Sequence, residues 1–263
     1  MNIDLQKIRV ILLAAGYGTR LKPLTDIFPK CLMPVGNAPL LEHWLTSLKN
    51  SGLFNVIVNT HYKANIVTEF LKRKQFKDWV INSFEENLLG TAGTVRAHKN
   101  FVGNNILMLV HADNWTHCNL MEFIEFHYNY RNKKCPITMM TFDSDKPQDC
   151  GIVEVDAEGV VVKFHEKKAN PPGKKANAAI YLIEPEVIDW LVENPDKNDF
   201  STEVLPYFMG KIATWHNPKI HRDIGTIDAL VQAQSDSMPV GCYVKDEWID
   251  NYNKLDLIGK IRR

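Results

Sequence analysis

The residues best suited to carry out chemistry lie in a loop over residues 13–30, directly after the first predicted strand. We call this segment the glycine loop. The loop contains Gly16 and Gly18, followed by the two cations Arg20 and Lys30. Glycines just beyond a buried strand allow backbone N–H groups to approach an anion closely. Arginine and lysine can hold phosphates and neutralise charge at a phosphorus centre. The pattern therefore predicts a site for a polyphosphate.

Two familiar phosphate motifs do not occur here. A dinucleotide fingerprint requires a third glycine where Leu21 stands and an acidic residue about 20 residues further on. The sequence G-x-x-x-x-G-K-[ST] is also missing. On these residues alone, two interpretations stay open: a phosphate site, or a strand-to-helix turn with two solvated cations.

The length of the loop favours a functional role. Loops longer than about 12–15 residues are usually functional or disordered. Disorder is disfavoured because three prolines stiffen the segment and three apolar side chains can anchor it. These residues are Pro23, Pro29 and Pro34, and Leu21, Leu24 and Phe28.

The elements around the loop follow a βα pattern up to about residue 142, because short apolar runs alternate with segments of helical period. Strands are predicted over 8–14, 54–59, 79–84, 106–110 and 137–142, and helices over 38–50, 63–73, 91–98 and 119–130. Shorter β pieces follow over 151–155, 160–165 and 177–183, then a helix over 185–193, a strand over 211–216 and a helix over 226–235. The pattern predicts an α/β fold with a mainly parallel sheet and a β-richer second half.

Composition excludes several classes of protein. The 263 residues are 45% hydrophobic and 24% charged, as in ordinary globular domains. Lys and Arg number 31 and balance 31 Asp and Glu, so nothing marks a nucleic-acid or membrane-surface partner. Five cysteines without a C-x-x-C pair do not form a disulfide framework, and no stretch resembles a signal peptide or a membrane span. We expect a cytoplasmic protein.

The loop sequence L-A-A-G-Y-G-T-R-L-K-P-L-T, with P-K at residues 29 and 30, resembles the signature of the sugar-1-phosphate nucleotidylyltransferases. The resemblance continues through P-V-G-N-A-P at 34–39 and through later motifs as far as about residue 233. Within this family, the motifs of the sequence most resemble those of mannose-1-phosphate guanylyltransferases. It implies a Rossmann-like fold of the nucleotide-diphospho-sugar transferase type, a nucleoside triphosphate, a sugar 1-phosphate and Mg²⁺.

Two carboxylates complete the implied catalytic set. H-A-D-N follows the strand at 106–110, and R-D-I-G-T lies at 222–226; both resemble metal-binding motifs of the family. The resemblance implies that Asp113 and Asp223 bind Mg²⁺, which is usually shared between one or two carboxylates and substrate phosphates. The alternative is that Asp113 caps a turn and Asp223 the following helix. The expected catalytic residues are Arg20, Lys30, Asp113 and Asp223.

The nucleotide site is expected to extend from the glycine loop to E-E-N-L-L-G-T-A-G at 85–93. Guanine presents N1–H and N2–H₂ side by side, and one carboxylate can accept both. Glu85 therefore favours guanine, unless it or Glu86 is a solvated charge at a strand end. The expected nucleotide-binding residues are Leu13, Ala14, Ala15, Gly16, Gly18, Thr19, Arg20, Glu85, Gly90 and Asp113.

The resemblance also implies a sugar pocket. The segments G-I-V-E at 151, F-H-E-K at 164 and N-A-A-I-Y at 177 are similar to family motifs, with Lys168 and Ala179 as departures. The expected sugar-phosphate-binding residues are Asn114, Gly151, Glu166, Lys167 and Asn177.

The resemblance implies an enzyme that joins a nucleoside triphosphate to a sugar 1-phosphate and releases pyrophosphate by direct in-line attack. GTP and mannose or heptose 1-phosphate are the expected substrates, which would place the product in nucleotide-sugar and cell-surface polysaccharide synthesis. The same reaction with CTP, UTP or dTTP and another acceptor stays open, as does a catalytically silent regulatory homologue.

The expected organisation is a catalytic domain over 1–234 and a helical tail over 235–263. Within the domain, a nucleotide-binding half would cover about 1–142 and a sugar-binding half about 143–234. The tail either packs on its own domain or on a second subunit, so a homo-oligomer is one of the two outcomes.

Overall fold

A computed structural model describes residues 3–237, 244–257 and 259 of the chain. These residues form two compact units that interleave along the sequence. Unit 1 comprises residues 1–11, 89–110 and 118–219, and unit 2 comprises residues 12–88, 111–117 and 220–263. The division predicted near residues 142 and 234 is a functional one and stays a prediction.

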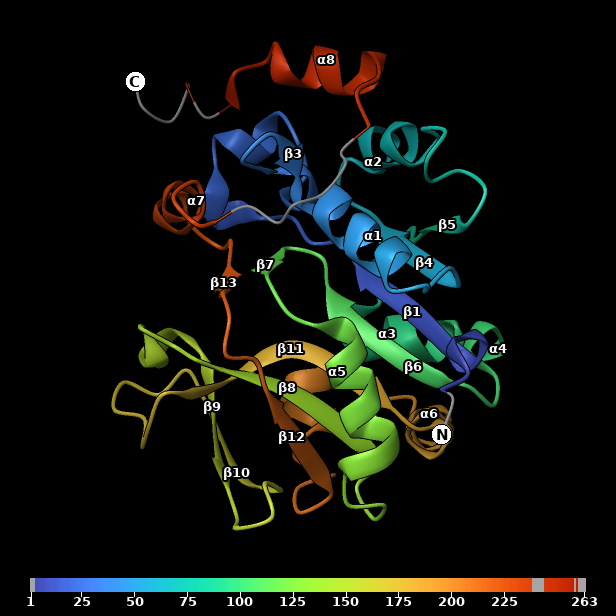
Figure 1. Cartoon of the computed structure of the whole chain (residues 1–263), viewed down its shortest axis with the longest axis vertical. Helices are drawn as coiled ribbons and strands as arrows, with labels where there is room; N and C mark the ends of the chain where they lie inside the picture. Colours follow the sequence, from blue (N-terminus) through green and yellow to red (C-terminus); the bar gives the residue numbers. More distant parts are fainter. Residues whose placement is uncertain (1–2, 238–243, 258, 260–263) are drawn as a thin grey trace. The chain divides into compact units, whose positions relative to one another are not determined.

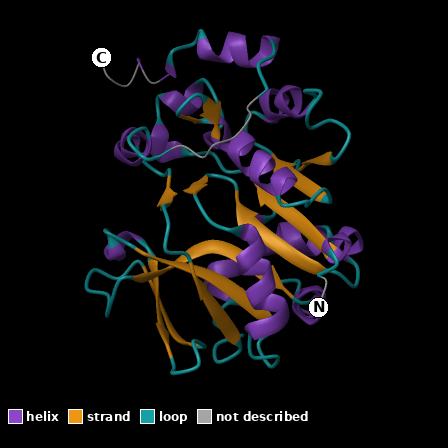
Figure 2. Cartoon of the chain, viewed as in Figure 1, coloured by secondary structure: helices purple, strands orange, loops and turns teal. Residues whose placement is uncertain are grey.

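Unit 1 contains most of the antiparallel strands (Figures 1 and 2). The long strand β11 pairs antiparallel with β6, β8 and β9, and β9 pairs with β10. β12 lies parallel to β8. Its complete strands are β8 (Ile137–Asp143), β9 (Gly151–Val155), β10 (Val161–Glu166), β11 (Lys175–Ile183) and β12 (Ile212–His216). It also contains β6 (Ile106–His111) except for its last residue, and the first four residues of β1 (Ile8–Leu13). Its helices are α3 (Gly90–Ala97), α4 (Lys99–Val102), α5 (Leu120–Glu125) and α6 (Pro185–Glu193).

Unit 2 begins with the last two residues of β1 and carries the glycine loop. β4 (Val56–Thr60) is buried along its whole length and pairs parallel with β5 (Val80–Phe84). Two short ribbons, β2 (Pro34–Val35) with β3 (Ala38–Pro39) and β7 (Asn114–Thr116) with β13 (His221–Asp223), complete the strands. Its helices are α1 (Leu40–Asn50), α2 (Ala64–Leu71), α7 (Ile227–Ala233) and α8 (Glu247–Asn253).

Local sequence explains where several helices lie. α1 begins after Pro39 and buries Leu41, Trp44, Leu45 and Leu48 on one face, at helical spacing. α6 has a proline in its first turn, which suits the fixed backbone of that residue. The Thr226 side chain accepts a hydrogen bond from the Ala229 N–H and caps α7.

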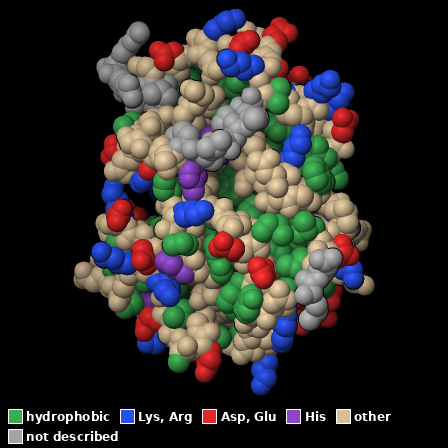
Figure 3. All heavy atoms as spheres, viewed as in Figure 1, with side chains coloured by type: hydrophobic (Ala, Val, Ile, Leu, Met, Phe, Trp, Pro, Cys, Tyr) green, Lys and Arg blue, Asp and Glu red, His purple; other side chains and the backbone are tan. Residues whose placement is uncertain are grey.

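The predicted α/β class is confirmed, with a mixed sheet flanked by helices and a β-richer second half. Each strand and helix expected before residue 236 is present within a few residues of its predicted ends. Cys31, Cys118, Cys135 and Cys150 are free thiols, and Cys242 lies outside the described residues. Among those residues, no helix has the length and apolar character that crossing a membrane requires. On the face shown in Figure 3, side chains of both charge signs are interspersed.

Candidate functional site

The glycine loop leaves β1 and is fixed at its start by backbone and side-chain contacts within unit 2. The Ala14 N–H donates to the Asn59 Oδ1 over 2.7 Å, and the Ala112 N–H donates to the Leu13 carbonyl over 3.0 Å. Gly18 has a φ of 63°, where an L side chain is disfavoured. A Cβ at Gly18 would lie 3.0 Å from the Lys30 Cβ. Gly18 therefore allows the loop to turn directly over Lys30. The same turn contains the other loop residues predicted to contact nucleotide, which are Ala15, Gly16 and Thr19.

The rest of the loop is anchored in an apolar cluster, as its sequence predicts. Leu21 and Leu24 are buried beside Trp115 and Ile224, and Phe28 packs against the same cluster. These contacts hold a long segment without regular structure in one conformation.

Lys30 is the buried cation of the site. It lies on the 3₁₀ turn Lys30–Leu32, and 9% of its surface is exposed. Its Nζ donates to the Asp113 Oδ2 over 2.6 Å and to the Asp223 Oδ1 over 2.9 Å. Burial by itself would lower the pKa of Lys30, but the two carboxylates raise it above its ordinary value. Burial would likewise raise the pKa of Asp113, and the Lys30 ammonium brings it below its ordinary value. Lys30 and Asp113 therefore both carry their charge at neutral pH.

A short ribbon of strands brings the two carboxylates together. β13 pairs antiparallel with β7, with Asp223 opposite Asn114, and the Ile224 N–H donates to the Asp113 carbonyl over 3.3 Å. Asn114 itself is buried, and its carbonyl accepts from the Trp44 Nε1. Because Thr226 caps α7, Asp223 does not serve as the helix cap.

Arg20, which lies near the middle of the loop, reaches the same site. Its Nη2 lies 3.5 Å from the Asp223 Oδ2, and 63% of its side chain is exposed. A Cβ on Gly225 would lie 2.7 Å from both of these atoms. Gly225 therefore leaves the space in which Arg20 and Asp223 meet. Unit 2 thus brings all four predicted catalytic residues together.

The donor set at this point fits a divalent cation with oxygen ligands. One oxygen from each of Asp113 and Asp223 already faces a single positive charge, the Lys30 ammonium. Mg²⁺ commonly takes one or two carboxylates and fills its other positions with water and substrate phosphates. Within the described residues, no cluster of three or more His, Cys, Asp or Glu forms a complete protein cage.

Glu85 lies at the end of β5 and is 5% exposed, whereas Glu86 is exposed. The Asn59 Nδ2 donates to the Glu85 Oε1 over 2.9 Å, and Asn59 also holds the Ala14 N–H described above. The Glu85 carbonyl contacts the His61 Nδ1 over 2.9 Å. Glu85 is therefore a fixed, buried carboxylate connected to the glycine loop through Asn59, a residue that sequence reasoning did not single out.

Gly90 belongs to unit 1 and begins α3. Its φ is 75°, and a Cβ there would lie 2.3 Å from the Asn198 carbonyl oxygen. Only glycine allows this close backbone approach.

Unit 1 also brings three of the residues predicted for the sugar phosphate together. Gly151 on β9 pairs with Glu166 on β10, and a Cβ on Gly151 would lie 2.8 Å from the Glu166 Oε2. Lys167 is exposed at a φ of 46°, with its Nζ 3.5 Å from the Glu166 Oε1. The adjacent carboxylate and ammonium form a polar pair at the end of this ribbon.

Asn177 lies at an irregularity of β11, where the register against β8 shifts. Its Oδ1 accepts from the Ala179 N–H over 2.9 Å, and its Nδ2 donates to the Tyr181 hydroxyl over 2.7 Å. Ala179 has a φ of 54°, a conformation that favours the glycine of the family motif. The alanine at residue 179 therefore adopts a backbone conformation that carries local strain.

The sequence of this chain matches one known protein family. The family model described as "Nucleotidyl transferase" matches residues 9–238, so the chain belongs to that family.

Two curated relatives are similar to most of this chain. The mannose-1-phosphate guanyltransferase of Pichia angusta is 28% identical over 221 residues, 82% of this chain. The mannose-1-phosphate guanylyltransferase of Mycobacterium tuberculosis is 29% identical over 235 residues, 88% of this chain. The chain spans 60% and 64% of the length of these two relatives.

A crystal structure of a Bacillus anthracis protein, assigned as a glucose-1-phosphate thymidylyltransferase and bound to sucrose, has a TM-score of 0.79 at 22% identity. The match covers 92% of this chain and 99% of that chain, and it shows a shared fold.

Proposed function

We propose that this chain joins a nucleoside triphosphate to a sugar 1-phosphate and releases pyrophosphate. The observation that carries the proposal is that Lys30 pairs with both Asp113 and Asp223, and Arg20 pairs with Asp223, at a glycine-rich loop. Similarity to mannose-1-phosphate guanylyltransferases supports GTP and mannose 1-phosphate as the first substrates to test, with heptose 1-phosphate next.

The reaction needs positioning and charge stabilisation rather than a covalent intermediate. An oxygen of the sugar phosphate attacks the α-phosphorus, the bond from that phosphorus to the bridging oxygen breaks, and pyrophosphate leaves. In the proposal, backbone N–H groups of residues 13–19 hold the triphosphate, Arg20 binds the leaving pyrophosphate, and Lys30 stabilises charge at the α-phosphate.

The remaining roles follow the same logic. Asp113 and Asp223 would hold Mg²⁺, which supplies charge neutralisation between the two phosphorylated substrates. Lys167 would orient the incoming phosphate. The sugar hydroxyls would contact Asn114, Gly151, Glu166 and Asn177.

The buried carboxylate of Glu85 supports guanine as the base. Guanine offers two adjacent donors to a carboxylate, whereas uracil and thymine offer one N–H between carbonyl acceptors. Asn59 restrains Glu85 through one oxygen, and such restraint preserves the geometry that a paired recognition needs.

The central experiment measures pyrophosphate release with Mg²⁺, crossing GTP, CTP, UTP, dTTP and ATP with mannose, heptose, glucose and amino-sugar 1-phosphates. Release above background in any pair supports transfer, and the best pair identifies the substrates. Asp223→Ala and Arg20→Ala should lower turnover by orders of magnitude, while Asp26→Ala, an exposed residue of the same loop, should not. No release from any pair would favour the catalytically silent alternative.

A second experiment tests the base. Glu85→Gln should lower kcat/KM for GTP by roughly 10- to 100-fold, because a charge-assisted pair of hydrogen bonds is lost. Glu86→Gln is the matched control at the exposed neighbouring carboxylate. Equal loss for GTP and UTP in Glu85→Gln would assign Glu85 a structural role.

The proposed reaction suggests a cellular location and a role for the product. A nucleoside triphosphate substrate and the four free thiols fit the cytoplasm, and a nucleotide sugar fits synthesis of cell-surface polysaccharide. Measuring the nucleotide sugar and surface polysaccharide in cells that lack the chain tests this assignment.

A further inference from the structure

The tail segment, defined here as residues 244–257, belongs to unit 2 and contains α8. Ile249, Tyr252 and Leu257 are buried, with exposed fractions of 3 to 4%. They form an apolar cluster with Ile27 and Phe28 of the glycine loop. The Phe28 ring lies edge-on to the rings of Tyr252 and Trp248. The tail segment therefore contacts the glycine loop just before Lys30.

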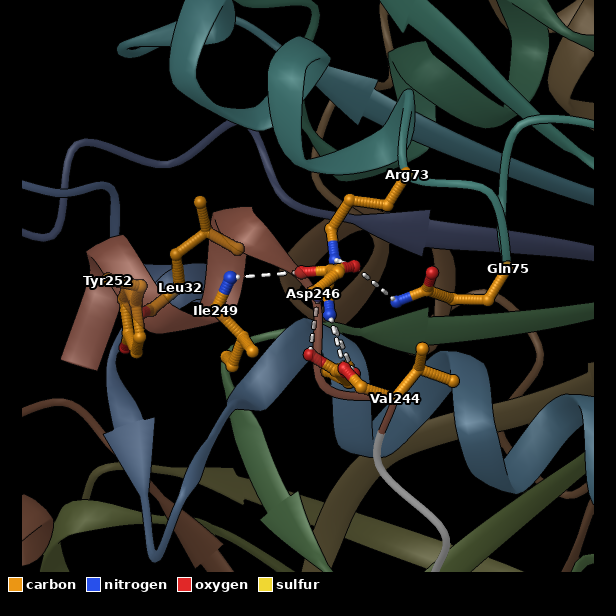
Figure 4. Close-up of polar contacts among 8 residues, drawn as sticks. Leu32, Arg73, Gln75, Val244, Asp246, Ile249 and Tyr252 are labelled. Carbon is orange, nitrogen blue, oxygen red and sulfur yellow. Dashed lines mark hydrogen bonds and ion pairs between the residues drawn. The ribbon is translucent and has the colours of Figure 1, made fainter.

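A buried charge cluster fixes the start of the tail segment (Figure 4). Arg73 donates through Nε to the Asp246 Oδ2 over 2.7 Å and through Nη2 to the Val244 carbonyl over 3.1 Å. Its Nη1 donates to the Glu42 Oε2 over 2.6 Å. The side chains of Arg73 and Glu42 are only 3% and 2% exposed. Because buried charges require partners, the tail segment supplies contacts that Arg73 needs.

The same aspartate organises α8. Its Oδ1 accepts from the Ile249 N–H over 3.0 Å and caps the helix, while its Oδ2 binds Arg73 (Figure 4). The orientation of α8 is thus coupled to a buried cation, and α8 in turn presents Tyr252.

Tyr252 makes the contact on the other side of Lys30. Its hydroxyl donates to the Leu32 carbonyl at the end of the Lys30–Leu32 turn. Within this turn, the Leu32 N–H donates to the Pro29 carbonyl and the Met33 N–H to the Lys30 carbonyl. Tail contacts therefore flank Lys30 at Phe28 and at Leu32, two residues away on either side.

We propose that the tail segment positions Lys30 for catalysis, with Tyr252 as the positioning residue and the Asp246–Arg73 ion pair as the anchor that sets α8 against the loop. This role for Lys30 rests on the proposed nucleotidyl transfer. Tyr252 acts through the backbone of residues 27–33 and needs no contact with substrate.

The first test measures the turn directly and requires no activity. Hydrogen exchange of peptides covering residues 27–33 should be about 2- to 10-fold faster in Tyr252→Phe, the factor that one net hydrogen bond is worth. Asp246→Asn keeps a helix cap but removes the negative charge that pairs with Arg73, and it should accelerate exchange in the same peptides. Asp250→Asn, at an exposed position of α8, is the matched control and should not. Unchanged exchange in both Tyr252→Phe and Asp246→Asn overturns the proposal.

The second test asks whether the effect reaches Lys30. Tyr252→Phe should lower kcat by a similar factor with little change in KM for the nucleotide, because Lys30 acts on charge that develops in the transition state. In a Lys30→Met background, Tyr252→Phe should cause no further loss. Equal losses in both backgrounds would mean that Tyr252 does not act through Lys30.

The two tests separate the two proposals. An inactive wild-type protein would refute the proposed function, and the exchange experiment would still decide whether the tail segment holds the Lys30 turn. Active protein with unaltered exchange would retain the function and refute the positioning role.

Discussion

Lys30→Met is the most informative single substitution, because it keeps most of the side-chain stem and removes the charge between two carboxylates. The variant loses bonds of 2.6 and 2.9 Å, and hydrogen bonds to charged groups contribute roughly 1.5–3 kcal/mol each. Part of this loss is recovered, because the Asp113 and Asp223 side chains are 29% and 54% exposed and water can solvate them. The free energy of unfolding should therefore fall by about 1–3 kcal/mol.

The loss of turnover should be larger than the loss of stability suggests. A preorganised charge at the reacting phosphate is worth about 10²- to 10³-fold in kcat, as for the removal of one oxyanion donor. Urea unfolding followed by tryptophan fluorescence and pyrophosphate release measure the two effects on the same preparation.

Lys22→Met is the matched control for this experiment. Lys22 lies in the same loop but is 59% exposed, with its Nζ 3.3 Å from Asp26. It should change stability by less than about 0.5 kcal/mol and leave turnover unaltered. If folded Lys30→Met matches Lys22→Met in both measurements, the assignment of Lys30 is refuted.

Three further predictions concern other positions. Burial lowers the pKa of His43 from 6.5 to about 4, so the unfolded chain protonates first as pH falls. His43 should therefore remove roughly 3 kcal/mol of stability between pH 6.5 and 4, and urea unfolding at several pH values should show a smaller slope in His43→Gln. Ala179→Gly relieves the left-handed backbone and should be neutral or stabilising by up to about 1 kcal/mol in urea, whereas Ala178→Gly should destabilise by a similar amount. Gly225→Ala places a Cβ 2.7 Å from Arg20 and Asp223, and should lower kcat/KM by roughly 10- to 100-fold with little loss of stability; normal kcat/KM would show that their contact is dispensable.

Much of the fold follows from local patterning, because several of the strands are short apolar runs bounded by turns. Val56–Thr60 and Ile106–His111 illustrate this, since their buried residues are contiguous in the sequence. The loop cations and both carboxylates were also identifiable, because their neighbours form long motifs.

Non-local pairings were beyond the reach of such patterns. The ribbon that brings Asp223 beside Asp113 joins two three-residue strands, each too short for a periodic signal. The partnership of Asn59 with Glu85 crosses from β4 to the end of β5 and leaves no mark in spacing. The left-handed conformation of Ala179 was hidden because alanine is an unusual residue there.

The interleaved order of the two units has a consequence for biosynthesis. Lys30 precedes Asp113 by 83 residues and Asp223 by 193. At about 5–20 residues per second, a ribosome needs about 10 to 40 s to make the interval between Lys30 and Asp223. During that time, Lys30 of the glycine loop lacks at least one of its two carboxylate partners. Tyr252 is synthesised later still. Unit 2 can close only after all of unit 1 has been synthesised, so we expect the site to be among the last parts of the molecule to assemble.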